Sequence, residues 1–443
     1  MAYINYHGFV LPKSLIDEEL LDKIKTELFV APEISFGNFK AVYFKVYIEA
    51  KLHYILPIHY ALKLEIPFTV KFIKGQVLSN FSSCNITLRD SQLDCYNVCS
   101  LEKNKDFGGG IINLQTAAGK TVLALKLMAY FSTKSLVVVN KIELINQWNM
   151  EIKKFIPKAR VGIIQGAKFD IIDKDIIIGT LQSISLKGNL KAADFKSIDT
   201  CFIDEIHNTS TESFSKIMFK VRPRLLFGLT ATLERKDKME KIIKWYIGDV
   251  IYSKVDDSKK QITQVKFYKY TGESSVNITL RDGTAAVSSM LSNIAQDTSR
   301  TNLIVKVLLD LIKDKDRMIL VLGDRITQLK YINKAIGDLH SGLFIGGLTR
   351  EQKDTTKTKQ IILGTYAVCN EGFSLEKLNC LVFSTPRSSI VQGIGRIYRK
   401  HHTLTPIIID FWDQFGIFKA QGYRRKKVYR ECIENPEFSE EII

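Results

Sequence analysis

Apolar positions from residue 86 onward fall in short continuous runs, separated by longer stretches with helical patterning. The first series of runs occupies residues 111–114, 136–139, 175–178, 201–203 and 225–227. The second series occupies residues 318–321, 343–345, 360–363, 380–383 and 407–409. Continuous apolar runs of this length are typical of strands buried on both faces of a parallel sheet. The pattern therefore predicts two α/β domains in tandem, and the polar segment 253–261 predicts the linker between them.

The N-terminal part of the chain follows a different pattern, rich in aromatic and β-branched residues. Residues 43–48 and 68–73 alternate as half-buried strands do, and residues 49–64 between them predict a helix. This segment therefore predicts a small α+β accessory domain. The expected boundaries are 1–85 for the accessory domain, 86–255 for the first α/β domain and 256–443 for the second.

One hexapeptide occurs twice. Asn-Ile-Thr-Leu-Arg-Asp stands at 85–90 and again at 277–282. Nothing around the two copies matches, so we interpret the repeat as coincidence and not as evidence of duplicated domains.

Composition narrows the class of partner. The chain has 443 residues, a net charge of +16 and 45% hydrophobic residues, which is enough for sizeable cores. A basic excess of this size favours a polyanionic partner, and nucleic acid is the usual one. No apolar run approaches the length of about 18 residues that a membrane helix needs, so we expect no membrane partner.

The seven cysteines are scattered and odd in number, which suggests a reducing compartment. The start of the chain has no basic segment followed by an apolar one, so we expect a cytoplasmic protein that is not secreted. Cys84, Cys95 and Cys99 lie close together, but no fourth ligand follows at a metal-binding spacing.

A phosphate-binding loop is predicted at residues 115–121, between an apolar strand and a helix that spans 122–130. The backbone of such a loop aims N–H groups at phosphate oxygens. Lys120 would reach the β- and γ-phosphates of a nucleotide, and the Thr121 hydroxyl would bind Mg²⁺. The pattern is imperfect, because Leu114 stands where the first glycine belongs. The phosphate-cradling residues are Thr116, Ala117, Ala118 and Gly119.

An acidic pair, Asp204 and Glu205, follows the predicted strand 201–203. Asp204 would hold Mg²⁺, mostly through water, and Glu205 would orient and deprotonate the attacking water. The alternative is an exposed turn that happens to carry two acids. His207, two residues further on, would by itself be an unremarkable loop histidine.

Arg396 and Arg399 stand three residues apart on a predicted helical face of the second domain. They are candidate arginine fingers, which stabilise charge on the γ-phosphate during transfer. From the second domain they reach that phosphate only if the domains close, so hydrolysis would be coupled to motion. The alternative is a basic face that touches phosphodiesters only.

Taken in order, these segments resemble the helicases and translocases of superfamily two, over about residues 86–415. The resemblance implies two RecA-like domains, with ATP and Mg²⁺ as cofactors. It implies that Arg89 and Gln92 read adenine, and that Thr230, Ala231 and Thr232 couple hydrolysis to strand binding. Residues 364–373, including Gly372, resemble the fifth motif, and residues 392–399 the sixth. It further implies that His207 contacts Gln392 across the cleft.

Within the superfamily, the chain resembles the phage UvsW-like branched-DNA helicases, with XPB-like and poxvirus transcript-release helicases as relatives. Three features carry this: the Thr-x-Ala-Gly-Lys form of residues 116–120, Gln147 followed by Trp148, and a short approach to the sixth motif at 384–389. The resemblance implies 3′-to-5′ movement on forks, displacement loops and four-way junctions, and a phage or other viral origin.

Candidate nucleic-acid contacts follow from motif position in the resemblance. They are Lys141, Gln147, Trp148, Thr180, Gln182 and Thr365. Trp148 would stack on a base, or else anchor the core with Ile145 and Ile152. The basic run 423–430 would grip nucleic acid, or else form a solvated helical face.

The sequence therefore predicts a monomeric, ATP-dependent DNA helicase or translocase that acts on branched DNA in recombination, repair and replication restart. Three alternatives stay open. The first is an RNA-directed helicase or transcript-release factor. The second is the motor subunit of a restriction system, and the third is a non-catalytic, nucleotide-gated clamp.

Overall fold

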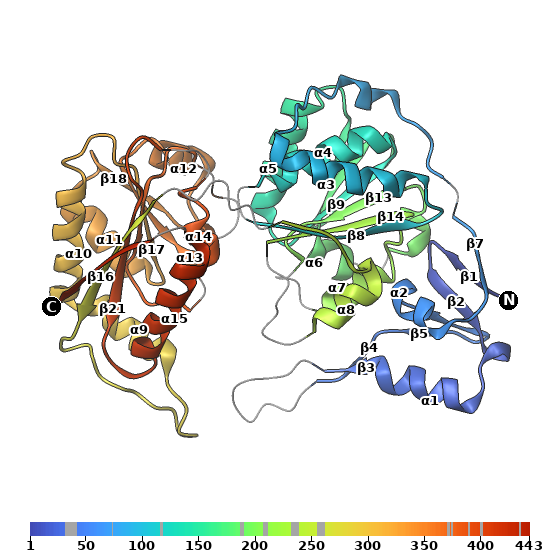
Figure 1. Ribbon diagram of the computed structural model, residues 1–443, viewed down its shortest axis with the longest axis horizontal. Helices are drawn as coiled ribbons and strands as arrows, with labels where there is room; N and C mark the ends of the chain where they lie inside the picture. The colour runs from blue at the N-terminus through green and yellow to red at the C-terminus, as the bar shows by residue number, and fades with distance from the viewer. Residues whose placement is uncertain are drawn as a thin grey trace. The chain divides into compact units, whose positions relative to one another are not determined.

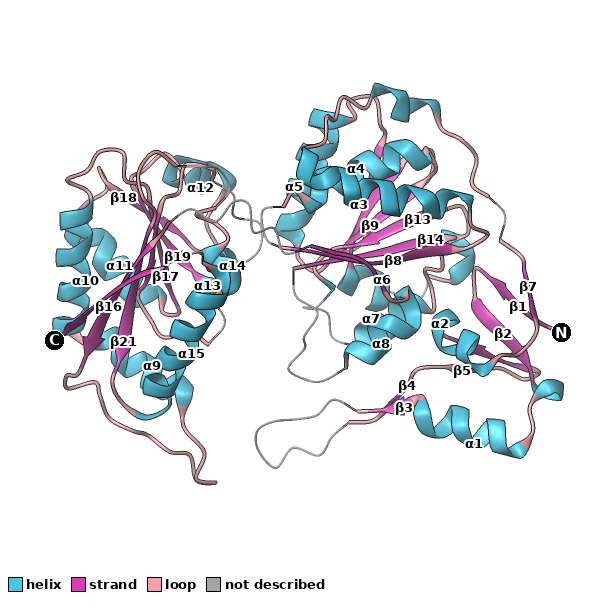
Figure 2. Ribbon diagram, viewed as in Figure 1, coloured by secondary structure: helices cyan, strands magenta, loops and turns pink. Residues whose placement is uncertain are grey.

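The computed structural model describes residues 1–31, 42–72, 74–115, 118–186, 190–206, 211–231, 239–254, 262–369, 373, 375–388, 390–398, 402–433 and 436–443, with the backbone alone at 211, 350 and 392. The chain divides into two compact units, residues 1–255 and 256–443. Helices flank the sheets in both units (Figure 2). No helix in the described part of the chain has the length and hydropathy of a membrane span.

The first unit is built on an eight-stranded sheet with the order β11-β10-β12-β9-β13-β14-β8-β15. Its strands are β8 (Gly108–Leu114), β9 (Ser135–Val139), β10 (Val161–Gln165), β11 (Lys168–Phe169), β12 (Ile176–Thr180), β13 (Thr200–Ile203), β14 (Leu225–Thr230) and β15 (Val250–Lys254). Every described pairing is parallel except that of β10 with β11. The carboxyl ends of the parallel strands therefore share one edge of the sheet.

Helices cover both faces of this sheet (Figure 1). They are α3 (Asp90–Ser100), α4 (Lys120–Phe131), α5 (Ile142–Phe155), α6 (Leu181–Leu186), α7 (Thr211–Met218) and α8 (Glu240–Ile247). Alternate residues of β9 contribute to two cores on opposite faces of the sheet. Val137 and Val139 pack with α3, α4 and α5, whereas Leu136 and Val138 pack with α6, α7 and α8. Burial on both faces explains why the central strands read as continuous apolar runs.

A smaller mixed sheet, β5-β6-β2-β1-β7, precedes the large one in the chain. Its strands are β1 (Ala2–Asn5), β2 (Gly8–Pro12), β5 (Ile48–Glu49), β6 (His53–Leu56) and β7 (Phe68–Val70), and α1 (Glu18–Glu27), α2 (Ile58–Ala61) and the pair β3 (Phe29–Val30) with β4 (Phe44–Lys45) accompany it. The small sheet shares a hydrophobic core with the large one. The rings of Tyr60 on α2 and Trp245 on α8 pack edge to face, 5.4 Å apart.

Two predictions for this segment were wrong. Residues 43–48 form two short strands, and residues 49–64 form a tight β5–β6 hairpin followed by the short helix α2. Pro57 precedes α2 and fits only at a helix start, so a single helix through this segment is excluded. Residue 73 of the predicted strand 68–73 lies outside the described residues.

The second unit holds a seven-stranded sheet, β18-β19-β17-β20-β21-β16-β22, in which every described pairing is parallel. Its strands are β16 (Gln264–Tyr270), β17 (Ile319–Gly323), β18 (Ser341–Phe344), β19 (Ile361–Thr365), β20 (Cys380–Phe383), β21 (Ile407–Asp413) and β22 (Glu437–Ile442). Its helices are α9 (Val287–Gln296), α10 (Thr298–Leu311), α11 (Ile326–Ile336), α12 (Arg350–Thr356), α13 (Tyr366–Cys369), α14 (Val391–Ile394) and α15 (Gly416–Cys432).

All ten predicted apolar runs fall on strands of the two large parallel sheets. The predicted fold class, α/β with two tandem parallel-sheet domains and a small N-terminal α+β segment, is confirmed.

Candidate nucleotide and nucleic-acid site

The phosphate loop leaves β8 and enters α4, as the sequence predicts. Gly119 caps α4 in the left-handed region, with φ of 80°. A Cβ atom at Gly119 would lie 2.5 Å from Gln92 Nε2, so a side chain here would be excluded twice, by backbone strain and by contact. Thr116 and Ala117 lie outside the described residues.

The side chain of Gln92, on α3, supports this loop by hydrogen bonding to its backbone. Its buried amide nitrogen donates hydrogen bonds to the carbonyls of Ala118 (3.2 Å) and Gly119 (3.1 Å). Its Oε1 accepts a bond from the backbone N–H of Arg89, 3.0 Å away. Both ends of the Gln92 amide are therefore engaged within the protein. An adenine contact by Gln92, or by the exposed Arg89 side chain, remains a prediction.

Lys120 is the first residue of α4, and its amine points back over the loop. Lys120 Nζ donates to the carbonyl of Leu114 at 3.2 Å and lies 3.7 Å from Glu205 Oε1. The structure thus brings together the predicted phosphate-binding lysine and the predicted catalytic glutamate. They meet at the carboxyl edge of the sheet, where β8 and β13 end.

Asp204 lies directly after β13 and is buried. Its backbone N–H donates to the carbonyl of Val138, and its Oδ2 accepts a hydrogen bond from the indole N–H of Trp148 at 3.0 Å. Burial, and then the negative charge of Glu205, raise the pKa of Asp204 to about 6, against the opposing effect of the Trp148 hydrogen bond. A carboxyl group with a raised pKa beside a second carboxylate is suited to a cation.

Glu205 adopts a left-handed backbone conformation, with φ of 49°. This is uncommon for a residue with a side chain, and such strain concentrates at functional sites. Thr121, in the first turn of α4, and Asp204 are the residues that would hold Mg²⁺. A Mg²⁺ site with few protein ligands, completed by phosphates and water, fits this donor set.

The predicted coupling segment begins at the end of β14. Thr230 is fully buried as the last residue of that strand, and Ala231 follows it partly exposed. Thr232 and His207 lie outside the described residues, so the predicted contact of His207 with Gln392 stays a prediction.

Three of the predicted nucleic-acid contacts, Lys141, Thr180 and Gln182, line one cavity of about 630 Å³. It opens where β9, β10 and β12 end. Thr180 Oγ1 donates to Ser183 Oγ at 2.7 Å, and the N–H of Gly166 donates to the same Ser183 oxygen at 3.0 Å. Motif position alone did not identify the other polar residues of this cavity, which are Asn140, Glu143, Gln165 and Ser183.

Trp148 does not reach this cavity. Its side chain is 1% exposed and packs in the core that α5 shares with the sheet. Its role is that of a core anchor and a hydrogen-bond donor to Asp204, so the prediction that it stacks on a base was wrong for this arrangement. Gln147, its neighbour, is partly exposed.

In the second unit, Thr365 ends β19 and is buried. Arg396 is 3% exposed; its Nη1 donates to the carbonyl of Phe373, and its guanidinium lies 5.8 Å from the centre of that ring. The predicted helical face is only partly correct, because α14 ends at Ile394 and Arg396 lies in a tighter turn after it. Arg399 and Gly372 lie outside the described residues, as does the side chain of Gln392.

The basic run 423–430 lies on α15 and is divided by burial. Arg425 is 1% exposed and makes a two-pronged ion pair with Asp410, at 2.7 and 2.8 Å. Arg424 and Lys427 are exposed. Within this run, Arg425 therefore anchors the core, whereas Arg424 and Lys427 belong to a solvent-exposed face of the helix.

Known proteins have sequences similar to this chain. Residues 85–235 match the family model described as type III restriction enzyme, res subunit. The L396 protein of Acanthamoeba polyphaga mimivirus, whose name makes it an ATP-dependent RNA helicase, is 28% identical over 97% of this chain and 85% of its own length. The D10 protein of Escherichia phage T5, named as a helicase, is 27% identical over 72% of this chain and 71% of its own length.

The fold is shared with a solved structure. The chain aligns with Saccharomyces cerevisiae Dbp5 bound to RNA and ADP BeF3 at a TM-score of 0.56 and 11% identity, over 84% of this chain and 96% of that one. T4 UvsW aligns over 100% and 99% of the two chains at a TM-score of 0.41 and 18% identity. The matched family implies ATP and nucleic acid as ligands. Residues 85–235 are thus similar to the restriction-enzyme res family, the chain as a whole is similar to proteins named as viral helicases, and its fold is shared with Dbp5.

Proposed function

We propose that this protein is an ATP-dependent DNA helicase or translocase that unwinds or branch-migrates forks, displacement loops and four-way junctions. The observation that supports the ATPase most directly is the 3.7 Å approach of Lys120 to Glu205 beside the buried Asp204. A basic group for phosphates, a carboxylate for the metal and a carboxylate for water activation meet at one sheet edge. A non-catalytic clamp would have no need for all three.

The chemistry follows from these side chains. Lys120 and the backbone of the loop around Gly119 bind the phosphates, while Gln92 holds that loop in shape. Thr121 and Asp204 hold Mg²⁺, which neutralises charge on the β- and γ-phosphates when bound. Glu205 orients the attacking water and accepts its proton. Trp148 keeps Asp204 oriented through its indole N–H.

Nucleic acid would bind along the cavity that contains Lys141, Thr180 and Gln182. Its polar lining consists of three amides, two hydroxyls, the cation of Lys141 and the carboxylate of Glu143. Amides, hydroxyls and a cation suit contacts to a sugar-phosphate backbone and not to particular base edges. The net charge of +16 supports a polyanionic ligand. We therefore expect sequence-independent and salt-sensitive binding.

Branched DNA is proposed from the sequence resemblance to the UvsW-like helicases. RNA is the second candidate, because relatives in mimivirus and African swine fever virus are named as RNA helicases. The matched family description also keeps a restriction motor open as a third. The small N-terminal sheet is the proposed recognition element for junctions, since it is the part of the first unit outside the large parallel sheet.

Strand-displacement assays test the proposal. Wild-type protein with ATP is given a labelled fork, a labelled four-way junction and an RNA duplex with a single-stranded tail. Lys120→Ala serves as the control without turnover, and Lys126→Ala as the matched control on the same helix, where Nζ binds the carbonyl of Ile86. ATP-dependent separation of the DNA substrates supports the proposal. Separation of RNA alone would move it to the second candidate.

A further inference from the structure

A tight hairpin follows β16 in the second unit. Ala286 N–H donates to the carbonyl of Ile278, and Leu280 N–H donates to that of Thr284, at 2.8 and 2.7 Å. At the turn, Asp282 Oδ1 accepts bonds from the backbone and the hydroxyl of Thr284. The yellow hairpin extends away from the core of its own unit in Figure 1.

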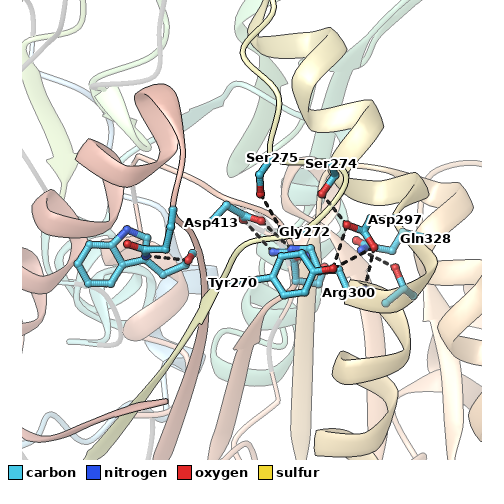
Figure 3. A network of polar contacts seen from close by, with 12 residues as sticks. Tyr270, Gly272, Ser274, Ser275, Asp297, Arg300, Gln328 and Asp413 are labelled. Atoms are coloured by element: carbon cyan, nitrogen blue, oxygen red, sulfur yellow. Dashed lines mark hydrogen bonds and ion pairs between the residues drawn. The ribbon is translucent and has the colours of Figure 1, made fainter. Parts of the chain in front are cut away.

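A polar network lies at the base of this hairpin, with Ser274, Arg300 and Asp413 buried and Asp297 partly exposed (Figure 3). Asp297 caps α10 and accepts hydrogen bonds from the hydroxyls of Tyr270 and Ser274, at 3.1 and 2.6 Å. Arg300, fully buried, makes a two-pronged ion pair with Asp413, at 2.8 and 3.0 Å. Paired charges in a low-dielectric interior hold their geometry firmly, because breaking one pair leaves a buried charge unpaired.

Apolar contacts hold the hairpin on its inner side. Ile278 and Ala285 pack against a small core made of Met290, Ile294, Phe415 and Phe418. Asn277 closes against the backbone of α15: a Cβ at Gly416 would lie 2.1 Å from Asn277 Oδ1. The hairpin is therefore a supported projection and not a free loop.

The tip presents an apolar side chain to solvent. Leu280 is 54% exposed, and Arg281 and Asp282 beside it are also exposed. A single exposed leucine is ordinary on a protein surface. Here, however, the leucine stands at the end of a braced projection with a cation next to it.

The position of the hairpin in the sheet adds a second argument. Because all described pairings in this sheet are parallel, the hairpin after β16 leaves from the same edge as Thr365, the last residue of β19, and Ser384, which follows β20. Arg300 Nη1 donates to the Ser384 carbonyl at 2.6 Å. The base of the hairpin is thus linked, through Asp297 and Arg300, to the segment that leads toward α14.

We propose that residues 277–286 are a strand-separating pin, with Leu280 stacking on the terminal base pair of a duplex and Arg281 contacting its backbone phosphate. The inference rests on the helicase function proposed above and deepens it. Apolar side chains inserted at base steps unstack them. A motor that draws one strand past a fixed apolar tip would open the duplex there, and the tip would replace part of the stacking lost.

The test compares Leu280→Ser with Leu339→Ser in the full-length protein. Leu339 is 80% exposed just before β18, at the opposite edge of the same sheet, so it controls for the loss of a surface leucine. Loss of a base-stacking contact of about 1.4 kcal/mol corresponds to roughly a ten-fold slower step. We expect Leu280→Ser to unwind a fork roughly ten-fold more slowly, with single-strand-stimulated ATPase unchanged.

A fluorescent 2-aminopurine at the last paired position of the fork reports unstacking directly. We expect the wild type and Leu339→Ser to raise its fluorescence on binding, and Leu280→Ser not to. Normal unwinding by Leu280→Ser would overturn the pin and leave the helicase function intact. Equal loss of ATPase and unwinding in that variant would also overturn it. Absence of stimulated ATPase in the wild type would instead refute the proposed function.

Discussion

Trp148 donates its indole N–H to Asp204 Oδ2 over 3.0 Å, and both side chains are buried. This bond joins α5 to the carboxyl end of β13, where the acidic pair begins. The tryptophan therefore acts as a positioning residue for the proposed metal ligand. It also favours the ionised form of a carboxyl group whose pKa burial otherwise raises.

Trp148→Phe should shift the pH dependence of ATP hydrolysis. Metal binding needs ionised Asp204, so kcat/KM falls as the pH drops through the pKa of about 6. Removing a hydrogen bond to the charged form raises that pKa, by roughly one unit for a bond of about 1.5 kcal/mol. The acid limb of the kcat/KM profile should move to higher pH. Trp245→Phe, which alters a tryptophan on α8, should leave the limb in place; a change in maximal rate without any shift would contradict the assignment.

Asp204→Asn should inactivate the protein and stabilise its fold. The pKa of this carboxyl is raised from 3.8 to about 6, so its favourable contribution is present below pH 4 and is lost as the pH rises through 6. At pH 8 the amide should unfold at higher denaturant, by at most about 3 kcal/mol, and the difference should shrink toward zero near pH 4. Urea unfolding at both pH values measures this. A variant less stable than the wild type at pH 8 would contradict the burial argument.

Gly119→Ala should weaken nucleotide binding more than backbone strain alone predicts. Its Cβ would meet Gln92 Nε2 at 2.5 Å and displace the bonds that support the loop. The matched control is Gly337→Ala, where φ is 92° but nothing lies within 4 Å of the new Cβ. Strain should cost both variants about 1–2 kcal/mol of stability. Only Gly119→Ala should raise the Kd for a nucleotide, measured by titration calorimetry. Equal nucleotide affinities in the two variants would contradict the claim that the Gln92 hydrogen bonds hold the loop in its binding conformation.

Lys141→Ala should lower nucleic-acid affinity and its salt dependence. If Lys141 neutralises one phosphate, the slope of log K against log salt should fall by about 0.7 on a single strand. Lys158→Ala removes an exposed cation before β10, at the opposite edge of the sheet, and should leave the slope unchanged. An identical slope in the wild type and Lys141→Ala, measured by fluorescence anisotropy, would remove this cavity from the binding path.

The central strands were predictable from the sequence, as was the meeting of Lys120 and Glu205 at one sheet edge, because both follow from local patterns. A strand buried on both faces must be apolar throughout, as β9 and β19 are. The outer strand β22 was missed, because most of its residues are exposed and polar. The sequence pattern could not show that Gln92 supports the phosphate loop. Its hydrogen bonds reach Ala118 and Gly119, which are 26 and 27 residues away in the chain, and form only in the folded protein.

Tertiary context decided the other cases. The hexapeptide Asn-Ile-Thr-Leu-Arg-Asp leads into α3 at 85–90, yet forms one side of the hairpin at 277–282. The surrounding cores select between these structures, because six residues alone specify neither. Likewise, Arg424 and Arg425 are neighbours in one basic run, but only Arg425 faces Asp410. Charge patterning shows that a run is basic and cannot show which of its members is buried.

The most direct test of the central claim is steady-state ATPase of the wild type and Glu205→Gln with single-stranded DNA, blunt duplex, a four-way junction and single-stranded RNA. Removing a general base should lower kcat by about 10²- to 10⁴-fold. The account predicts that DNA stimulates the wild type, most strongly as a junction, and that Glu205→Gln loses this stimulation on every substrate. Stimulation by RNA alone, or normal turnover by Glu205→Gln, would contradict it.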